Sequence, residues 1–456
     1  MARFTPHLPF ALLAVLFGFL WLAGGASRAD VMGQVIVRSV AWAILIAYIL
    51  FGPRPRLGDA RAVAGFLLAA TTLAALHLIP LPPSVWTALP GRELLIQAAA
   101  VIGEEQPWRP LSISPGATLN ALSSLIVPVV TLLLAAAFSR SEHWRTATML
   151  LVLIVASSLL ALVQFSGSRF DHPLINDVAG AVSGSFANRN HFALFAAIGC
   201  ILAPAWAFQE EGRGAWKPLA ALGLIVLFAM IILASGSRTG LLVGALGIAL
   251  GLLNVRRQIA SKLRRLPRKW SIALVVSSAG LVIAALILSV TLDRAVSIDR
   301  ASAMQAGEDL RLQVLPVIVE MTKLYFPVGS GLGAFDPVYR IHEPSALLGP
   351  AYVNHAHNDW LEVSLDAGLP GLLLLGAAVT WWLWNSIKVW TGKGNREGIL
   401  PRLGSGILLL VFIASVTDYP ARTPMIMAVV MLAGVWLSIG SRREGPASSS
   451  GRSSSG

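Results

Sequence analysis

The sequence predicts an all-α protein that crosses a membrane many times, and three observations carry that prediction. Of its 456 residues, 55% are hydrophobic and only 13% are charged, whereas roughly a quarter of the residues in a soluble domain are charged. The mean hydropathy is +0.71, and apolar runs long enough to cross a bilayer recur along the chain. The loops between these runs alternate in charge. Together these features exclude an ordinary cytosolic enzyme, a disordered tail and a secreted disulfide scaffold.

Hydropathy predicts twelve membrane helices, at residues 8–25, 31–51, 62–81, 118–138, 147–167, 191–208, 218–235, 239–254, 271–291, 367–390, 403–417 and 423–440. The first could instead be a cleaved signal peptide, because Arg3 precedes it and small residues follow it at 26–29. Its apolar stretch of about 18 residues is longer than such a signal normally needs. We therefore expect it to stay in the protein as a helix.

The charge of the connecting segments predicts the orientation. Basic residues outnumber acidic ones at both termini and in every second loop, most clearly in 255–269, which has no acid. Since cytoplasmic loops carry the excess of Lys and Arg, both termini are expected in the cytoplasm of a multi-pass protein. A net charge of +12 could also indicate nucleic-acid binding, but a topology anchor facing anionic lipid explains these basic loops better.

The spans divide the chain into four parts. Residues 1–291 hold membrane helices one to nine, 292–366 form a large periplasmic loop, 367–440 hold helices ten to twelve, and 441–456 are a disordered cytoplasmic tail. The loop is expected to begin with a polar helix (302–324) and a glycine turn (329–333), and to end with an amphipathic helix (355–366). A second long outer loop covers 82–117. Long inserts on one face of a bundle commonly carry function.

Polar residues gather at the outer ends of the predicted spans. Arg189 and His191 precede the sixth span, and Arg238 lies in a tight turn between the seventh and eighth. These arginines could simply extend to phospholipid headgroups, but the small polar residues around them leave room for an anionic ligand. Glycines 240, 244, 247 and 251 share nearly one face of the eighth span, which predicts close helix packing rather than chemistry.

The amphipathic helix expected at 355–366 places two histidines on different faces. His355 shares an acidic stripe, expected to be solvated, with Asp359, Glu362 and Asp366, whereas His357 lies on the apolar stripe and faces the bundle. A histidine on an apolar face is more often a packing residue than a catalyst. No metal motif occurs, and Cys200 is the only cysteine, so neither a bound metal nor a disulfide is expected. Arginines suit the binding of an anionic leaving group, and a histidine suits the role of general base.

The segment His357-Asn358, nine residues, Gly368-Leu-Pro-Gly371 resembles the signature of the bacterial O-antigen ligase superfamily, which includes lipid A–core O-antigen ligases and exopolysaccharide polymerases. Arg238 in Ser-Arg-Thr-Gly, Arg311 in the loop helix and the segment 327–335 agree with it. Asn188-Arg-Asn-His-Phe-Ala193 is similar to a segment of exopolysaccharide polymerase-like members. The resemblance covers residues 180–380 well and the first four spans only by hydropathy.

The resemblance implies a GT-C-like fold and inverting, metal-independent glycosyl transfer at the periplasmic face of the bacterial inner membrane. The donor would be an undecaprenyl-diphosphate-linked glycan, and the acceptor a hydroxyl of another glycan or of lipid A–core, without a cofactor. His357 would be the base, and Arg189, Arg238 and Arg311 would bind the diphosphate. His191, His355 and Asn358 would support these residues.

Two other function classes fit part of the pattern. Twelve spans with both ends inside are also common in transporters, so a lipid-linked glycan flippase is one alternative, and a non-catalytic export scaffold is another. Carriers usually hold ionisable residues near mid-membrane, whereas here only Arg38 and His77 are placed well inside spans. Within the enzyme class, polymerase is slightly favoured over ligase by the resemblance of residues 188–193.

Overall fold

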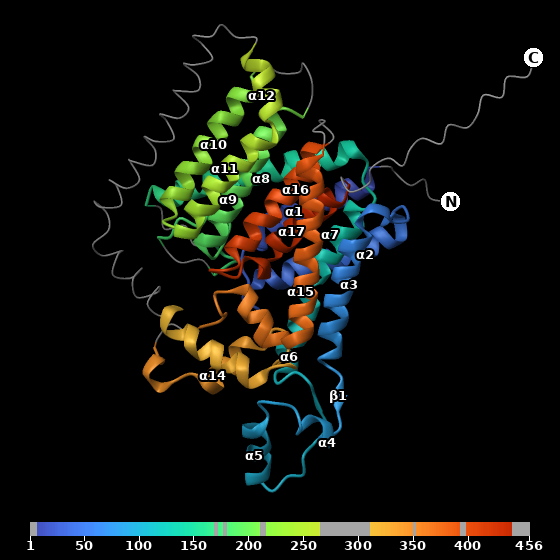
Figure 1. The fold of residues 1–456 in the computed structure, drawn as a ribbon, viewed down its shortest axis with the longest axis vertical. Helices are drawn as coiled ribbons and strands as arrows, with labels where there is room; N and C mark the ends of the chain where they lie inside the picture. Colours follow the sequence, from blue (N-terminus) through green and yellow to red (C-terminus); the bar gives the residue numbers. More distant parts are fainter. Residues whose placement is uncertain are drawn as a thin grey trace, which may run out of the picture.

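The protein is a bundle of helices with a smaller helical region at one end (Figure 1). The computed structural model describes residues 7–167, 172–176, 180–209, 216–264, 311–349, 353–392 and 398–439. The prediction of a polytopic helical membrane protein is confirmed, because the regular structure of these segments is helical apart from two strands of two residues each.

The helices of the first half are α1 (Leu8–Ala23), α2 (Met32–Phe51), η1 (Gly58–Ala60), α3 (Arg61–Leu76), α4 (Pro83–Trp86), α5 (Glu93–Val101), α6 (Pro115–Ser124), α7 (Ile126–Ala135), α8 (Arg140–Phe165) and α9 (Arg189–Ala207). The strands are β1 (Pro80–Leu81) and β2 (Arg109–Pro110), which pair antiparallel. The second half comprises α10 (Lys217–Ala234), α11 (Arg238–Asn254), α12 (Arg256–Leu263), a helix at 311–325, α14 (Phe335–His342), η2 (Ser345–Leu347), α15 (Asp359–Thr391), α16 (Ile399–Ala414), η4 (Pro420–Arg422) and α17 (Pro424–Ile439).

Each predicted span that falls in the described part of the chain corresponds to a helix. Seven helices there are long and apolar enough to cross a membrane, and α11 with α12, bent by 63°, makes an eighth candidate. Three further apolar helices, α1, α16 and α17, are shorter. The predicted ninth span (271–291), residues 302–310 of the predicted loop helix and the tail at 441–456 lie outside the described residues, so the count of twelve stays a prediction.

Helix α9 is the centre of the bundle, since all residues from 191 to 205 are buried. It packs against α8, α10, α11 and α16. The glycine face of α11 lies on it: a Cβ at Gly247 would come within 2.6 Å of the Ala197 carbonyl oxygen, and one at Gly251 within 2.6 Å of that of Cys200. The predicted close packing is therefore confirmed, and it sets α9 and α11 parallel with their first turns at the same end.

The smaller region has its own apolar cluster, formed by Val314, Ile318, Met321, Tyr325, Phe335, Val338, Tyr339 and Leu365. The glycine turn 329–333 joins it to α15, because the Gly331 amide donates to the Asp366 carbonyl at 2.9 Å. His77 was expected inside a span, but it lies just past the end of α3 and accepts a hydrogen bond from the Leu332 amide at 3.0 Å. His77 therefore ties a membrane helix to the glycine turn.

Helix α15 is broken where the predicted tenth span begins. Gly368 has φ +56°, and a Cβ there would overlap the Pro327 carbonyl, so only glycine fits. The Leu369 amide leaves the helix to donate to that carbonyl at 2.8 Å, and Pro370 follows in the first turn of the second segment, as expected. The break separates a short segment (359–367), which carries the acidic residues, from the apolar remainder of α15.

Candidate functional site

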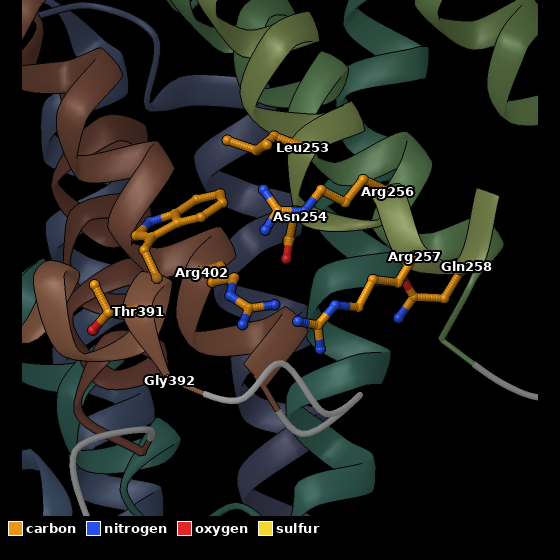
Figure 2. Close-up of a pocket in the computed structure, with 9 residues that line it drawn as sticks. Leu253, Asn254, Arg256, Arg257, Gln258, Thr391, Gly392 and Arg402 are labelled. Carbon is orange, nitrogen blue, oxygen red and sulfur yellow. The ribbon is translucent and has the colours of Figure 1, made fainter. Parts of the chain in front are cut away.

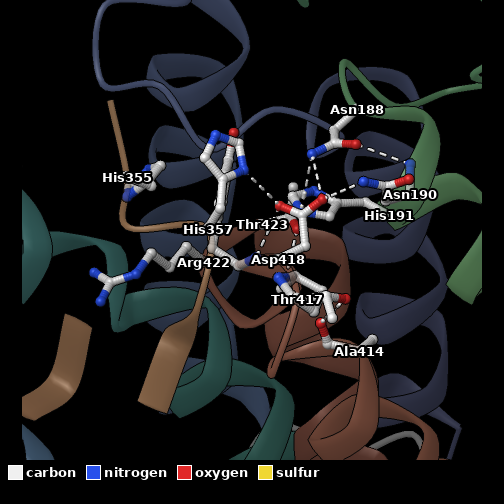
Figure 3. Close-up of polar contacts among 12 residues, drawn as sticks. Asn188, Asn190, His191, His355, His357, Ala414, Thr417, Asp418, Arg422 and Thr423 are labelled. Carbon is white, nitrogen blue, oxygen red and sulfur yellow. Dashed lines mark hydrogen bonds and ion pairs between the residues drawn. The ribbon is translucent and has the colours of Figure 1, made fainter. Parts of the chain in front are cut away.

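The turn between α16 and α17 (415–423) carries a carboxylate that is almost completely buried. The Asp418 side chain is 2% exposed. Three residues of the first turn of α9 surround it: Asn188 Nδ2 donates to Oδ2 at 3.1 Å, Asn190 Nδ2 donates to Oδ2 at 2.6 Å, and His191 Nε2 lies 3.5 Å from Oδ1 (Figure 3). Arg311 Nη2 lies 3.9 Å from Oδ2. Asp418 therefore connects α9, the loop helix and the α16–α17 turn.

His357 reaches the same carboxylate from the opposite side. Its Nδ1 lies 3.4 Å from Asp418 Oδ1, and its side chain is 22% exposed (Figure 3). The backbone on either side is fixed, because Ala356 donates to Glu362 at 2.8 Å and the Asp359 amide donates to the Ser415 carbonyl at 2.9 Å. Between them His357 adopts a left-handed conformation (φ +49°), which is uncommon for a residue other than glycine.

The predicted helix at 355–366 is thus shorter than expected. It begins at Asp359, with Asn358 as the N-cap, whose side chain accepts a hydrogen bond from the Leu361 amide at 3.0 Å. An N-cap residue has a non-helical backbone, so the helix does not extend to the residues before Asn358. As a result, His355 and His357 lie on an irregular segment rather than on two helical stripes.

Burial and neighbouring charges act in opposite directions on the two partners. Burial lowers the pKa of His357 from its ordinary value, and Arg311 and His355 lower it further, while Asp418 opposes the shift. Burial would raise the pKa of Asp418, but the hydrogen bonds and charges of His191 and His357 outweigh it and hold that pKa well below the ordinary value. Asp418 is therefore an anion, and His357 is mainly neutral, near pH 7.

Tyr419 packs between three histidines. The centre of its ring lies 5.0 Å from those of His191 and His357 and 4.2 Å from that of His355. Burial and the charge of Asp418 raise the pKa of its hydroxyl above the ordinary value, so it stays protonated. The phenol ring therefore packs against all three histidines.

The acidic stripe of α15 is buried rather than solvated, which corrects the sequence-based expectation. Glu362 and Asp366 are fully buried and Asp359 nearly so. Their counter-charge is Arg422, whose nitrogens lie 3.3 Å from Asp359, 3.2 Å from Glu362 and 3.8 Å from Asp366. Glu362 also pairs with His355, whose Nδ1 is 2.9 Å away. Buried charges require such partners, and the partner here comes from the turn that also carries Asp418.

The three arginines predicted to bind the diphosphate lie on three different helices. Arg311, 37% exposed, lies next to Asp418 as described. Arg189 directly follows Asn188, the N-cap of α9. Arg238 opens α11, where the neighbouring Thr239 hydroxyl lies 2.7 Å from that of Thr417, beside Asp418. The first turns of α9 and α11 and the segments 353–358 and 415–423 together are called the site end.

The residues that sequence reasoning missed are Asp418, Tyr419 and Arg422. All three lie in five residues between two apolar helices. A carboxylate and a guanidinium in so short an interfacial turn are costly without partners, and that cost was the available signal. Groups of three or more His, Cys, Asp or Glu side chains able to hold a metal are not found in the described segments.

We expect Arg422→Gln to lower the free energy of unfolding by about 3–5 kcal/mol, since it leaves three buried carboxylates without their cation. Thermal unfolding of the purified protein in detergent measures this. Arg340→Gln is the matched control, because Arg340 pairs with Asp336 on the surface of α14, where such pairs contribute about 0–1 kcal/mol. Equal stability of the two variants would contradict the role given to Arg422.

In a comparison with known protein families, residues 223–376 match a family model described as O-antigen ligase. This stretch runs from α10 to the middle of α15 and includes Arg238, Arg311 and His357, whereas Asp418 lies beyond it. No curated protein matches the chain. The family match confirms the resemblance carried by the histidine signature: residues 223–376 of this chain are similar to the O-antigen ligase superfamily.

Proposed function

We propose that this protein is an inverting, metal-independent glycosyltransferase of the bacterial inner membrane. It moves a glycan from undecaprenyl diphosphate to a sugar hydroxyl at the periplasmic face, and both termini are cytoplasmic. The observation that carries the proposal is the pairing of His357 with the buried Asp418, beside Arg311 and the first turns of α9 and α11. The acceptor is a second glycan or lipid A–core.

His357 serves as the general base. With Nδ1 donating to Asp418, the lone pair of the neutral ring is on Nε2, which accepts the proton of the acceptor hydroxyl. The hydroxyl oxygen then forms a bond to the anomeric carbon of the donor sugar. The bond from that carbon to the diphosphate oxygen breaks, and its electron pair leaves with the diphosphate. Attack from the opposite side inverts the anomeric centre.

Asp418 positions the base and stabilises its product. Its negative charge favours the imidazolium that forms when His357 takes the proton. The same carboxylate limits rotation of the imidazole ring. The hydrogen bonds of the Ala356 and Asp359 amides hold the backbone on either side and limit its movement further. A base held in one orientation does not have to be ordered again in each turnover.

Arg189, Arg238 and Arg311 bind the departing diphosphate. Guanidinium groups donate two parallel hydrogen bonds to a phosphate, and the first turns of α9 and α11 add the partial positive charge of helix N-termini. Negative charge that develops on the leaving oxygen is stabilised without a metal ion. The lipid tail lies between spans, and the reacting bond sits at the membrane surface.

His357→Ala should lower glycan transfer by about 10²–10⁴-fold, the usual contribution of a general base, while the protein still inserts. Purified protein with a lipid-linked donor and an acceptor glycan gives the rate, and EDTA should leave the wild-type rate unchanged. His342→Ala is the control, since His342 pairs with Tyr325 in the same loop.

His355→Ala should lower the rate of glycan transfer less than His357→Ala does. The reverse order would mean that His355 is the base.

The same variant in cells separates the two acceptor classes. Loss of long polymer with an intact core indicates polymerisation, the slightly favoured reaction. Accumulation of polymer on its lipid carrier indicates ligation. Near-normal glycan at the cell surface would remove His357 from the mechanism and favour a flippase, which joins no sugars.

Asp418→Asn should move the acidic limb of the kcat/KM profile to lower pH. The base is active when neutral, so activity falls as the pH drops through its pKa, and loss of the Asp418 charge lowers that pKa further. The plateau should fall by about 10²-fold or more, because an amide does not stabilise the imidazolium. Asp336→Asn, at an exposed ion pair, should change neither. A limb that stays in place or moves to higher pH contradicts the pairing.

Arg238→Lys and Arg311→Lys keep the charge but lose the two-pronged donor, so each should lower kcat by about 10²–10³-fold. Initial rates at saturating donor measure the effect. Arg340→Lys, in the exposed pair on α14, is the matched control. Full activity of Arg238→Lys would make Arg238 an anchor to lipid headgroups rather than a ligand of the diphosphate.

A further inference from the structure

A polar pocket lies at the end of the bundle away from the site end, where α11 meets α12 and α15 ends (Figure 2). Its volume is about 110 Å³, and it is lined by Leu253, Asn254, Arg256, Arg257, Gln258, Trp390, Thr391, Gly392 and Arg402. One water molecule needs roughly 10–15 Å³ of such space. The pocket therefore has room for a group as large as a phosphate.

The lining of this pocket is cationic. Arg256, Arg257 and Arg402 contribute guanidinium groups, and none of the lining residues is acidic. The side chains of Arg257 and Arg402 point toward one another across the pocket (Figure 2). Like charges that face each other repel, and an anion between them turns this repulsion into attraction. Phosphate matches the planar donor geometry of two guanidinium groups.

Contacts with the end of α15 hold one of the cationic groups, Arg402, in place. Arg402 Nε donates to the Val389 carbonyl at 2.9 Å, and its guanidinium carbon lies 5.7 Å from the centre of the Trp390 ring. The 63° bend between α11 and α12 turns the first residues of α12 into the pocket. The guanidinium group of Arg402 is therefore held before a ligand binds, which reduces the entropy cost of binding.

Two side-chain oxygens of the pocket favour a ligand that can also donate hydrogen bonds. Asn254 is 4% exposed, and its Nδ2 donates to the Ile399 carbonyl at 3.0 Å, which orients the amide. Asn254 Oδ1 and Gln258 Oε1 are buried and have no hydrogen-bond partner among the described residues. A buried acceptor without a donor is costly. A ligand hydroxyl satisfies it, so the lining suits an anion that also carries O–H groups.

We propose that this pocket binds the phosphate of a hydroxyl-bearing headgroup, with glycerol phosphate as the simplest such group. The pocket lies at the bend between α11 and α12, which together make one candidate span, and at the end of α15, which is another. A membrane lipid can reach such a place, and basic pockets between membrane helices bind anionic headgroups on the cytoplasmic side. Phosphatidylglycerol is the membrane source of this chemistry, and glycerol 3-phosphate is the soluble source.

The test uses the full-length protein in phosphatidylcholine nanodiscs that contain a rising fraction of phosphatidylglycerol, with bound lipid counted by native mass spectrometry after release. Arg256→Gln with Arg257→Gln should weaken retention on the order of tenfold or more, as expected for the loss of two charges near a headgroup. Lys262→Gln with Arg264→Gln removes two charges from the same segment outside the pocket and should retain the lipid as the wild type does.

Competition with glycerol 3-phosphate separates the two sources. Retention of phosphatidylglycerol that the soluble ester does not displace supports the lipid. Displacement by the soluble ester, again weakened only in the Arg256 and Arg257 variant, supports the same headgroup chemistry from solution. Equal retention by both double variants, or equal retention of phosphatidic acid and phosphatidylglycerol by the wild type, overturns the proposal.

Discussion

The buried carboxylate of Asp418 is the constraint on which the site end depends. An ion without water must find donors within the protein, and Asp418 takes them from three separate parts of the chain. Asn188, Asn190 and His191 come from the start of α9, Arg311 comes from the loop helix, and His357 comes from the segment 353–358. The cost of an unpaired buried charge therefore fixes where the irregular segment at 353–358 lies relative to the membrane helices.

A second buried network completes this arrangement four residues later. Arg422 holds the short acidic segment of α15, and Glu362 in turn holds the Ala356 amide and the His355 ring. The turn between α16 and α17 thus presents an anion to one histidine and a cation to the carboxylates that support the other. Displacement of this turn would disturb both histidines at once. The left-handed backbone at His357 is maintained because its two sides are bound to different partners.

The parts that sequence could predict are those with local causes. The glycine face of α11 repeats at helical spacing, so close helix packing there followed from periodicity alone, whereas its partner, α9, did not. The acidic stripe of α15 has the same periodicity, yet it was assigned to solvent because its counter-charge, Arg422, is distant in the sequence. Hydropathy ended the eleventh predicted span at residue 417, directly before Asp418, but it did not identify Asp418 or its partners. Ion pairs such as these form between residues that are distant in the sequence. A single sequence shows no periodic pattern from which they could be predicted.

The two ends of α11 differ in the charged residues that would surround a bound anion, and this difference fits the function that we propose for each end. An enzyme must release its leaving group, so binding energy is useful only where it favours the transition state. At the site end Asp418 lies within ion-pair distance of Arg311, and this negative charge weakens the hold on a diphosphate once it has formed. At the other end, about 25 Å away along a helix of 17 residues, the pocket is lined by three arginines and by no acidic residue. Such a lining favours retention of an anion, which suits the anchor that we propose rather than a catalyst.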